Sequence, residues 1–247
     1  MRPFAATGKT IRKIDPDGAA MRRMERDFEA AVTRALNALR LDLVRDIGDD
    51  PQVMLNRLND SRFTRPFQDA ITRQLEHVAL AGAEHGREQV EKYVFGTSKL
   101  FGVDMWALAN NAAVQWALGY GYELVTGLLA TTRNWLGIQV AEYVQNSETI
   151  GKLIGRIRQG TGFGEDRARM IAVTEVTRAF AEGNREAWKA SGVIEKREWR
   201  TNSDELVCPV CGPLAGRVVG LEEDFGDGLS GPPAHPRCRC WVVPRVG

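Results

Sequence analysis

The chain has 247 residues, enough for one large domain or two modest ones and enough to bury a hydrophobic core. Hydrophobic residues make up 43% and charged residues 26%, which is the composition of a folded globular protein and excludes a mainly disordered chain. Lys and Arg number 33 against 32 Asp and Glu, so net charge gives no reason to expect nucleic acid or an anionic membrane as a partner of the whole chain. The first 18 residues lack an apolar stretch of signal-peptide length, and we expect the protein to act in a cytoplasm.

Most of the chain carries helical signals. Apolar residues recur at spacings of three and four from Ala19 to Ile47, and this periodicity predicts an amphipathic helix that ends at Gly48. Capping residues and glycines divide the following sequence into further expected helices, over residues 51–59, 64–93, 105–118, 122–131, 134–144 and 148–158. A last helix is expected from Glu165 to about Ala190, after a glycine-rich loop at 160–164 that we interpret as a hinge between helices.

The most apolar stretch runs from Val103 to Ala130. Polar and charged residues interrupt it, so it cannot cross a bilayer as one clean span, and we expect a pair of core helices there and no membrane partner. Trp106, Trp116 and Trp135 lie on apolar helix stripes in this part of the chain. Such stripes suit docking into a larger assembly as well as an internal core.

The pattern changes after Ser191-Gly192. Short strands are expected within 193–201, 214–221 and 240–244, separated by turn residues and prolines. The predicted fold class is therefore α+β, with a mainly α-helical N-terminal region followed by a small α+β module. We place the boundary between two domains at residue 147, which gives domains 1–146 and 147–247.

All four cysteines fall in the last 40 residues. Cys208 and Cys211 form a Cys-x-x-Cys pair, and His235 and Cys238 form a second short pair after 23 intervening residues. Two short ligand pairs separated by a loop are typical of one tetrahedral zinc site. Cys240 is a fifth candidate ligand, because Cys238 and Cys240 point to the same face of an extended chain and either could complete the set.

Three interpretations of this cluster remain open. A structural zinc site that staples the module is favoured, because four protein ligands leave no open position for catalysis. Unligated thiols or a disulfide are the second interpretation, although no helical pattern follows Cys211, as it does in redox Cys-x-x-Cys motifs. A catalytic zinc ion is the third.

The same region carries a longer series of motif residues. In chain order they are Ala168-Arg-Met-Ile-Ala-Val-Thr174-Glu175, Gly192-Val193, Trp199-x-Thr201, Asp204-x-x-Val-Cys208-x-x-Cys211, Gly216 and Pro233-x-His235-Pro-x-Cys238-Arg-Cys240. Their order and spacing resemble the phage Mu protein F-like family of head morphogenesis, or minor head, proteins. The resemblance covers about Ser147 to Pro244 and departs at Val173, where the family pattern has arginine, so no role of that arginine carries over.

The resemblance implies a bacteriophage virion component that is made in the host cytoplasm and lies in the capsid interior or at the portal vertex. It implies the phage portal protein and other head proteins as partners, in procapsid assembly or DNA delivery. Under this interpretation the segment 147–247 is the Mu F-like domain, and the helical region 1–146 docks on the assembly. The protein is then expected to be structural and not an enzyme.

The alternative function is a metal-dependent nuclease or toxin-like effector that uses Glu175, Asp204 and His235. A nuclease site needs such groups around an open metal ion, but the only histidine of the module lies inside the cysteine cluster. Glu175 and Arg178 are spaced to pair along one helix, which a solvated helix face explains as well as a functional site. Between residues 152 and 200 there are 11 basic and 7 acidic residues, which could touch packaged DNA through its phosphates, although a solvated helix face is the simpler explanation.

Overall fold

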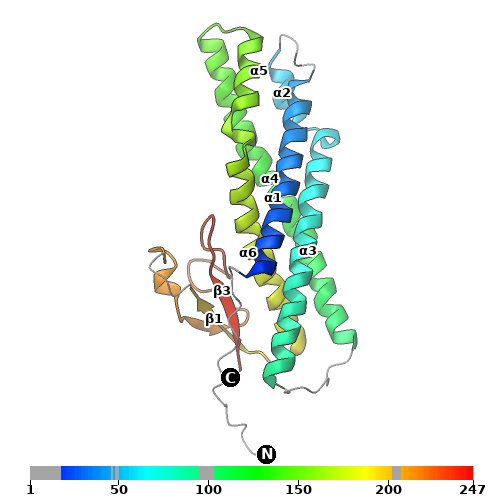
Figure 1. Ribbon diagram of the computed structural model, residues 1–247, viewed down its shortest axis with the longest axis vertical. Helices are drawn as coiled ribbons and strands as arrows, with labels where there is room; N and C mark the ends of the chain where they lie inside the picture. Colours follow the sequence, from blue (N-terminus) through cyan, green and yellow to red (C-terminus); the bar gives the residue numbers. More distant parts are fainter. Residues whose placement is uncertain (1–17, 46, 48–49, 95–102, 202–206, 247) are drawn as a thin grey trace, which may run out of the picture.

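The computed structural model describes residues 18–45, 47, 50–94, 103–201 and 207–246. It is an elongated bundle of long helices with a small sheet beside one half of the bundle (Figure 1). The long helices are α1 (Ala19–Val44), α3 (Ser61–Val94), α4 (Val103–Gln145) and α6 (Glu165–Ser191). The shorter α2 (Gln52–Arg57) and α5 (Ile150–Gln159) lie toward the end of the bundle remote from the sheet (Figure 1).

Helix α1, which the apolar periodicity predicted, is confirmed. The periodic residues are all buried, namely Met21, Met24, Phe28, Val32, Leu36, Leu39 and Leu43. The helix ends at Val44, a few residues before the expected end at Gly48. At this end the guanidinium of Arg57 hydrogen-bonds the carbonyl oxygens of Asp42 and Arg45. These carbonyls belong to the last turn, whose acceptors have no partner within the helix.

Helix α4 corrects the sequence prediction, because one helix of 43 residues replaces the three expected over 105–144. The first expected break, between residues 118 and 122, contains Gly119 and Gly121, and glycine costs a helix interior about 1 kcal/mol relative to alanine. Packing outweighs that cost here. Gly121 is buried against α3, where an added Cβ would lie 2.7 Å from the Thr72 hydroxyl oxygen. The expected pair of core helices over 103–130 is therefore a single continuous helix.

Helices α3 and α6 cross at close range through glycines. An added Cβ on Gly183 of α6 would overlap the carbonyl oxygen of Ala79 on α3. An added Cβ on Gly82 of α3 would likewise overlap the Phe180 carbonyl on α6. The small residues thus let the two backbones approach until they touch, and this crossing places the second half of α6 beside the sheet.

The glycine-rich loop expected as a hinge has a packing role. It forms a short 3-10 turn, η1 (Thr161–Phe163), between α5 and α6. Side chains at Gly160 or Gly162 would overlap or crowd the indole of Trp135, which also makes an edge-on contact with Phe163 at 5.9 Å between ring centroids. The loop backbone therefore packs closely against one aromatic ring of α4.

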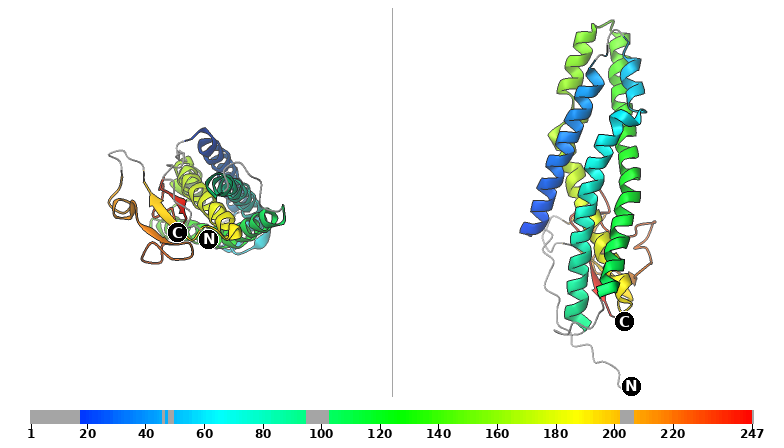
Figure 2. Two further views of the ribbon diagram at one scale, coloured as in Figure 1. Left: turned by 90° about the horizontal axis from the view of Figure 1, so that it is seen from below. Right: turned by 90° about the vertical axis from the view of Figure 1, so that its right-hand side faces the viewer.

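The C-terminal strands form a three-stranded antiparallel sheet in the described part of the chain. Strand β1 (Lys196–Arg200) lies in the centre, between β2 (Val218–Gly220) and β3 (Trp241–Arg245). All three fall within or next to the expected segments. Seen along the bundle, the sheet stands to one side of the helices (Figure 2). The mainly helical fold with a small C-terminal sheet is as predicted.

A single apolar core extends across the expected domain boundary at residue 147. It contains buried residues from Met21 in α1 to Ala179 in α6, including Leu153 of α5. A second, smaller core joins the sheet to the ends of α3 and α6 through Val90 and Trp188. The division into 1–146 and 147–247 stays a prediction.

Because α3 and α6 cross so closely, we expect one methyl group added at the crossing to destabilise the fold. Gly183→Ala should lower the free energy of unfolding by about 1–3 kcal/mol, because the helices must separate to admit the Cβ. Gly127→Ala on α4 is the matched control: nothing lies within 4 Å of its added Cβ, and the better helix propensity should stabilise by about 0.5–1 kcal/mol. Urea unfolding measures both, and equal effects would contradict the packing argument.

Candidate metal centre

The expected ligands come from two connections at one end of the sheet. Cys208 and Cys211 lie in the connection between β1 and β2, just before the short 3-10 turn η2 (Gly212–Leu214). His235, Cys238 and Cys240 lie in the segment that leads directly into β3. The pairing of β1 and β3 sets Arg200 opposite Trp241, so the chain leaving β1 and the chain entering β3 start side by side.

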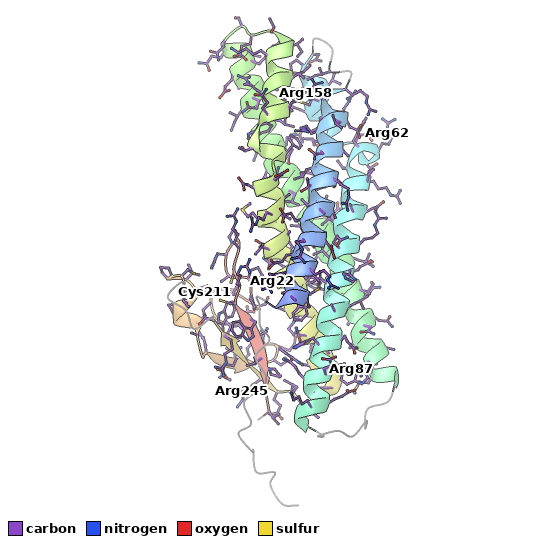
Figure 3. All side chains as sticks on the ribbon, viewed as in Figure 1. Arg22, Arg62, Arg87, Arg158, Cys211 and Arg245 are labelled. Atoms are coloured by element: carbon purple, nitrogen blue, oxygen red, sulfur yellow. The ribbon has the colours of Figure 1, made fainter. Side chains whose placement is uncertain are left out.

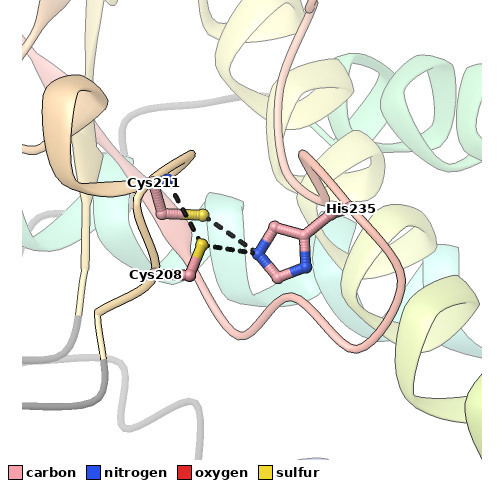
Figure 4. Close-up of side chains that lie close together, drawn as sticks. All are labelled: Cys208, Cys211 and His235. Carbon is pink, nitrogen blue, oxygen red and sulfur yellow. Dashed lines mark hydrogen bonds between the residues drawn. The ribbon is translucent and has the colours of Figure 1, made fainter.

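The first three donors converge on one point (Figure 4). The His235 Nε2 atom lies 3.1 Å from the sulfur of Cys208 and 3.3 Å from the sulfur of Cys211. The Cys-x-x-Cys turn is closed by main-chain hydrogen bonds from the N–H groups of Cys211 and Gly212 to the Cys208 carbonyl. This turn aims both sulfurs at the imidazole.

The orientation of the His235 ring suits a metal ligand. Its Nδ1 lies 2.8 Å from the Pro236 carbonyl oxygen, which can only accept, so Nδ1 carries a proton and donates it. In the neutral ring the lone pair is then on Nε2, the atom that faces the sulfurs. Without a metal ion, burial acts to lower the pKa of His235, but the Pro236 carbonyl and the nearby cysteines outweigh burial and raise it.

The remaining cysteines extend the cluster into the module core. Cys211, Cys238 and Cys240 are buried, and the sulfurs of Cys211 and Cys238 lie 3.7 Å apart. A hydrogen bond from the Cys240 thiol is the main cause that lowers the pKa of Cys238 to about 5, whereas burial is the main cause that raises the pKa of Cys211 to about 12.

The donor separations fit a small tetrahedral metal ion. Zinc–sulfur and zinc–nitrogen bonds of about 2.3 and 2.0 Å imply donor–donor distances of about 3.5–3.8 Å. Among the described residues, two sets have all donors within 4.8 Å of one another, and Cys211 belongs to both: Cys208, Cys211 and His235, and Cys211, Cys238 and Cys240. The structure thus brings together all five residues expected to be candidate metal ligands.

Two threonines of α6 contact the ligand-bearing segment, and sequence reasoning missed this role. The Thr177 hydroxyl donates to the Cys238 carbonyl at 3.1 Å, and the Thr174 hydroxyl accepts from the Arg237 N–H at 3.0 Å. The available signal was their spacing of three residues, which sets both side chains on one helix face. Val173, the departure from the family pattern, directly precedes Thr174 in sequence and is buried.

The expected pair of Glu175 and Arg178 is confirmed, with 3.3 Å between carboxylate and guanidinium. It is not a solvated helix-face pair, because Glu175 is buried and accepts a hydrogen bond from the Tyr120 hydroxyl of α4 at 2.8 Å. Burial is the main cause that raises the pKa of Glu175, against the opposing effects of Arg178 and Tyr120. Asp204, the third residue of the alternative nuclease interpretation, lies outside the described residues.

Most of the basic residues between 152 and 200 already have partners inside the molecule. Arg156 pairs with Glu142 and Glu148, and Arg185 pairs with carboxylates of α6 and with Glu222. Arg167 is half-buried and hydrogen-bonds carbonyl and hydroxyl oxygens of α4. In Figure 3, Cys211 lies in the sheet module, whereas Arg158 lies near the opposite end of the bundle. Contact with packaged DNA stays a prediction.

Fold and site together define a class of protein: a helical bundle whose last helix supports a small sheet module with a cysteine and histidine cluster. Comparison with known families finds a match for one part of the chain. Residues 136–243 match the family described as "Phage Mu protein F like protein", so this segment is Mu F-like and the resemblance is confirmed. The matched segment includes α5, α6 and all the candidate metal ligands.

One curated relative is "Uncharacterized protein YqbB" of Bacillus subtilis (strain 168), which is 23% identical over 118 residues. The aligned part is 47% of this chain and 39% of the relative, so the chain spans about two fifths of the relative's length. No solved structure matches the chain. Among the described residues, none of the helices has the length and apolar character needed to span a membrane.

The buried Glu175 predicts a pH-dependent stability. Because its pKa is higher in the folded protein than in the unfolded chain, the folded state loses stability as pH rises from about 4.5 through the folded-state pKa. Glu175→Gln keeps the acceptor for Tyr120 and removes the titration. The free energy of unfolding of the variant relative to wild type should therefore increase from pH 4.5 toward neutrality. Chemical denaturation across this range measures it, with the exposed Glu123→Gln as control. A constant difference would contradict the prediction.

Proposed function

We propose that this chain is a bacteriophage minor head protein that acts in head morphogenesis as a structural component of the virion. The observation that carries the proposal is the match of residues 136–243 to the Mu protein F-like family, over a segment whose cysteine and histidine cluster is assembled in the structure. Its partners are the portal protein and other head proteins, and it lies in the capsid interior or at the portal vertex after assembly in the host cytoplasm.

The cluster holds one structural zinc ion in this proposal. The ligands are Cys208, Cys211, His235 and one of Cys238 and Cys240. Thiolate and imidazole donors suit zinc, and four of them close the coordination shell. The module also needs such a bond, because its sheet has short strands and its core includes three of the cysteines themselves. Zinc would supply cross-linking between the two connections, without a position for substrate.

Zinc content tests this part of the proposal. Protein purified without chelators should contain about one equivalent of zinc, and Cys208→Ser or His235→Ala should remove it and lower the free energy of unfolding by about 4 kcal/mol or more. His77→Ala is the matched control, because His77 is an exposed histidine of α3 outside the cluster. Elemental analysis and thermal melting give the two readouts. Less than about a tenth of an equivalent in the wild type would rule out the zinc site.

A catalytic role is disfavoured by the positions of the alternative residues. Glu175 is bonded to Tyr120 and Arg178 between α4 and α6, whereas His235 points its Nε2 at two sulfurs in the sheet module. The two residues therefore face different neighbours. An open groove of about 400 Å³ between α1 and α3 is lined mainly by alanine, aromatic and arginine residues, without histidine or cysteine.

The surface that docks on the portal protein is, in this proposal, the outer face of α4. Leu108, Leu118 and Tyr122 are 66%, 44% and 63% exposed, and they succeed one another along a helix with few charged residues. The tryptophans expected to serve docking are instead at least half-covered: Trp116 stacks on Tyr120, and Trp135 packs against Phe163. Exposed apolar side chains on one helix face are typical of assembly surfaces.

Incorporation into heads tests the docking surface. The double variant Leu118→Ser/Tyr122→Ser should fold normally, because both side chains are exposed, yet its content in purified heads should fall at least about tenfold if each lost contact costs roughly 1 kcal/mol or more. Leu41→Ser is the control, since it removes a 52% exposed leucine from α1. Mass spectrometry of purified heads measures content. Wild-type levels of the double variant would reject the α4 surface, and absence of the wild type from heads would reject the minor head role.

A further inference from the structure

Helix α6 holds the main chain of the segment that carries the second ligand pair. Its two threonine contacts reach the Arg237 N–H and the Cys238 carbonyl, which flank the peptide bond between these residues. They do not touch the Cys238 sulfur or the His235 ring directly. The contacts therefore fix the backbone turn from His235 to Cys238 rather than any one ligand atom.

The Thr174 hydroxyl both donates and accepts a hydrogen bond in this arrangement. It donates to the Met170 carbonyl at 2.7 Å and accepts from the Arg237 N–H at 3.0 Å. Arg237 has a φ of 61°, in the left-handed region that residues with a Cβ rarely occupy. The turn is also closed by a hydrogen bond from the Cys238 N–H to the His235 carbonyl at 3.1 Å. The bond to Thr174 thus helps to hold a backbone shape that the chain would not adopt by itself.

The Thr177 hydroxyl works from a buried position. It lies 3.0 Å from the Val173 carbonyl and 3.1 Å from the Cys238 carbonyl, so its one proton is shared between a bond within α6 and a bond to the ligand segment. Removal of the hydroxyl would leave the Cys238 carbonyl short of a donor, which is costly where water is excluded. We then expect the His235–Cys238 turn to move away from α6.

We propose that Thr174 and Thr177 are positioning residues for the metal centre, which hold the His235–Cys238 turn in the shape that presents its ligands. The inference rests on the metal site proposed above and adds a role for the helical bundle in it. The same turn carries metal ligands and contacts α6. Metal binding and docking of the sheet module onto α6 therefore strengthen each other.

Valine substitutions test the proposal, because valine matches threonine in shape and lacks the hydroxyl. Thr174→Val and Thr177→Val should each weaken zinc binding about 10- to 100-fold, measured by competition with a chromophoric chelator. Cobalt(II) provides a spectroscopic signature: its visible bands should change in both variants, since they report ligand geometry. Thr174→Ser and Thr177→Ser keep the hydroxyl and should restore affinity and spectrum.

Thr126→Val is the matched control. Thr126 makes the same bond to the carbonyl four residues earlier, at 2.9 Å to Tyr122, but it lies exposed on α4. It should bind zinc and cobalt like the wild type. Thr174 is only half-buried, so its variant tests the proposal even if Thr177→Val fails to fold.

The outcomes separate the two proposals. Wild-type zinc affinity and cobalt spectra in both valine variants would overturn the positioning role, while loss of metal in Cys208→Ser would leave the metal site standing. A lower melting temperature of the metal-free variants with unchanged affinity would also overturn it. Failure of the wild type to bind either ion would overturn the metal site and the positioning role together.

Discussion

The position of helix α6 between the bundle and the sheet is the constraint on which the rest of the structure depends. The helix packs against α1, α3 and α4, and its buried residues lie on most of its circumference. A helix with neighbours on several sides cannot pack through a single stripe of large apolar residues. It uses small ones instead, such as Ala172, Ala179 and Gly183, which allow close approach from several sides. Separation of the chain at residue 147 would take α6 away from the helices that cover it.

The sheet module depends on contacts beyond its own hydrophobic residues. Its central strand packs Trp199 against Phe225, with ring centroids 5.1 Å apart, and Trp188 of α6 adds a third large side chain. Half of the other buried residues of this core are cysteines, and the other half are aliphatic. Small modules of this kind bury too little apolar surface to hold long connections in place. Docking on α6 offsets part of that deficit, and the proposed zinc ion would add a cross-link between the two ligand-bearing connections.

Much of the fold could be predicted because helix periodicity and capping are local properties. The apolar stripe of α1, the extent of α6 and the three strand segments all follow from residues close in sequence. The prediction was wrong for α4, where glycines at 119 and 121 suggested a break. Whether a glycine ends a helix depends on what lies against it, and Gly121 faces Thr72 on another helix. The residues next to Gly121 in sequence give no indication of that contact.

The candidate ligands could also be predicted, since two short pairs of metal-ligating residues are visible in the sequence. Their convergence depends on the pairing of β1 with β3, which the spacing of the ligands does not reveal. Thr174 and Thr177 could not be recognised as partners of the ligand segment. Both make the ordinary bond to a carbonyl four residues earlier, and only the tertiary fold adds the second contact.

The proposed zinc site has five candidate donors for four positions, which raises the question of what the fifth one does. Cys238 lies 3.7 Å from Cys211, and its own N–H and carbonyl are both held by hydrogen bonds. The hydrogen bond from the Cys240 thiol is the main cause that lowers the pKa of Cys238 to about 5. The same bond raises the pKa of Cys240. In the proposed zinc site, the main-chain bonds that hold Cys238 and the closeness of its sulfur to Cys211 favour Cys238 as the fourth ligand. Cys240, just before β3, is then a hydrogen-bonding neighbour of that ligand.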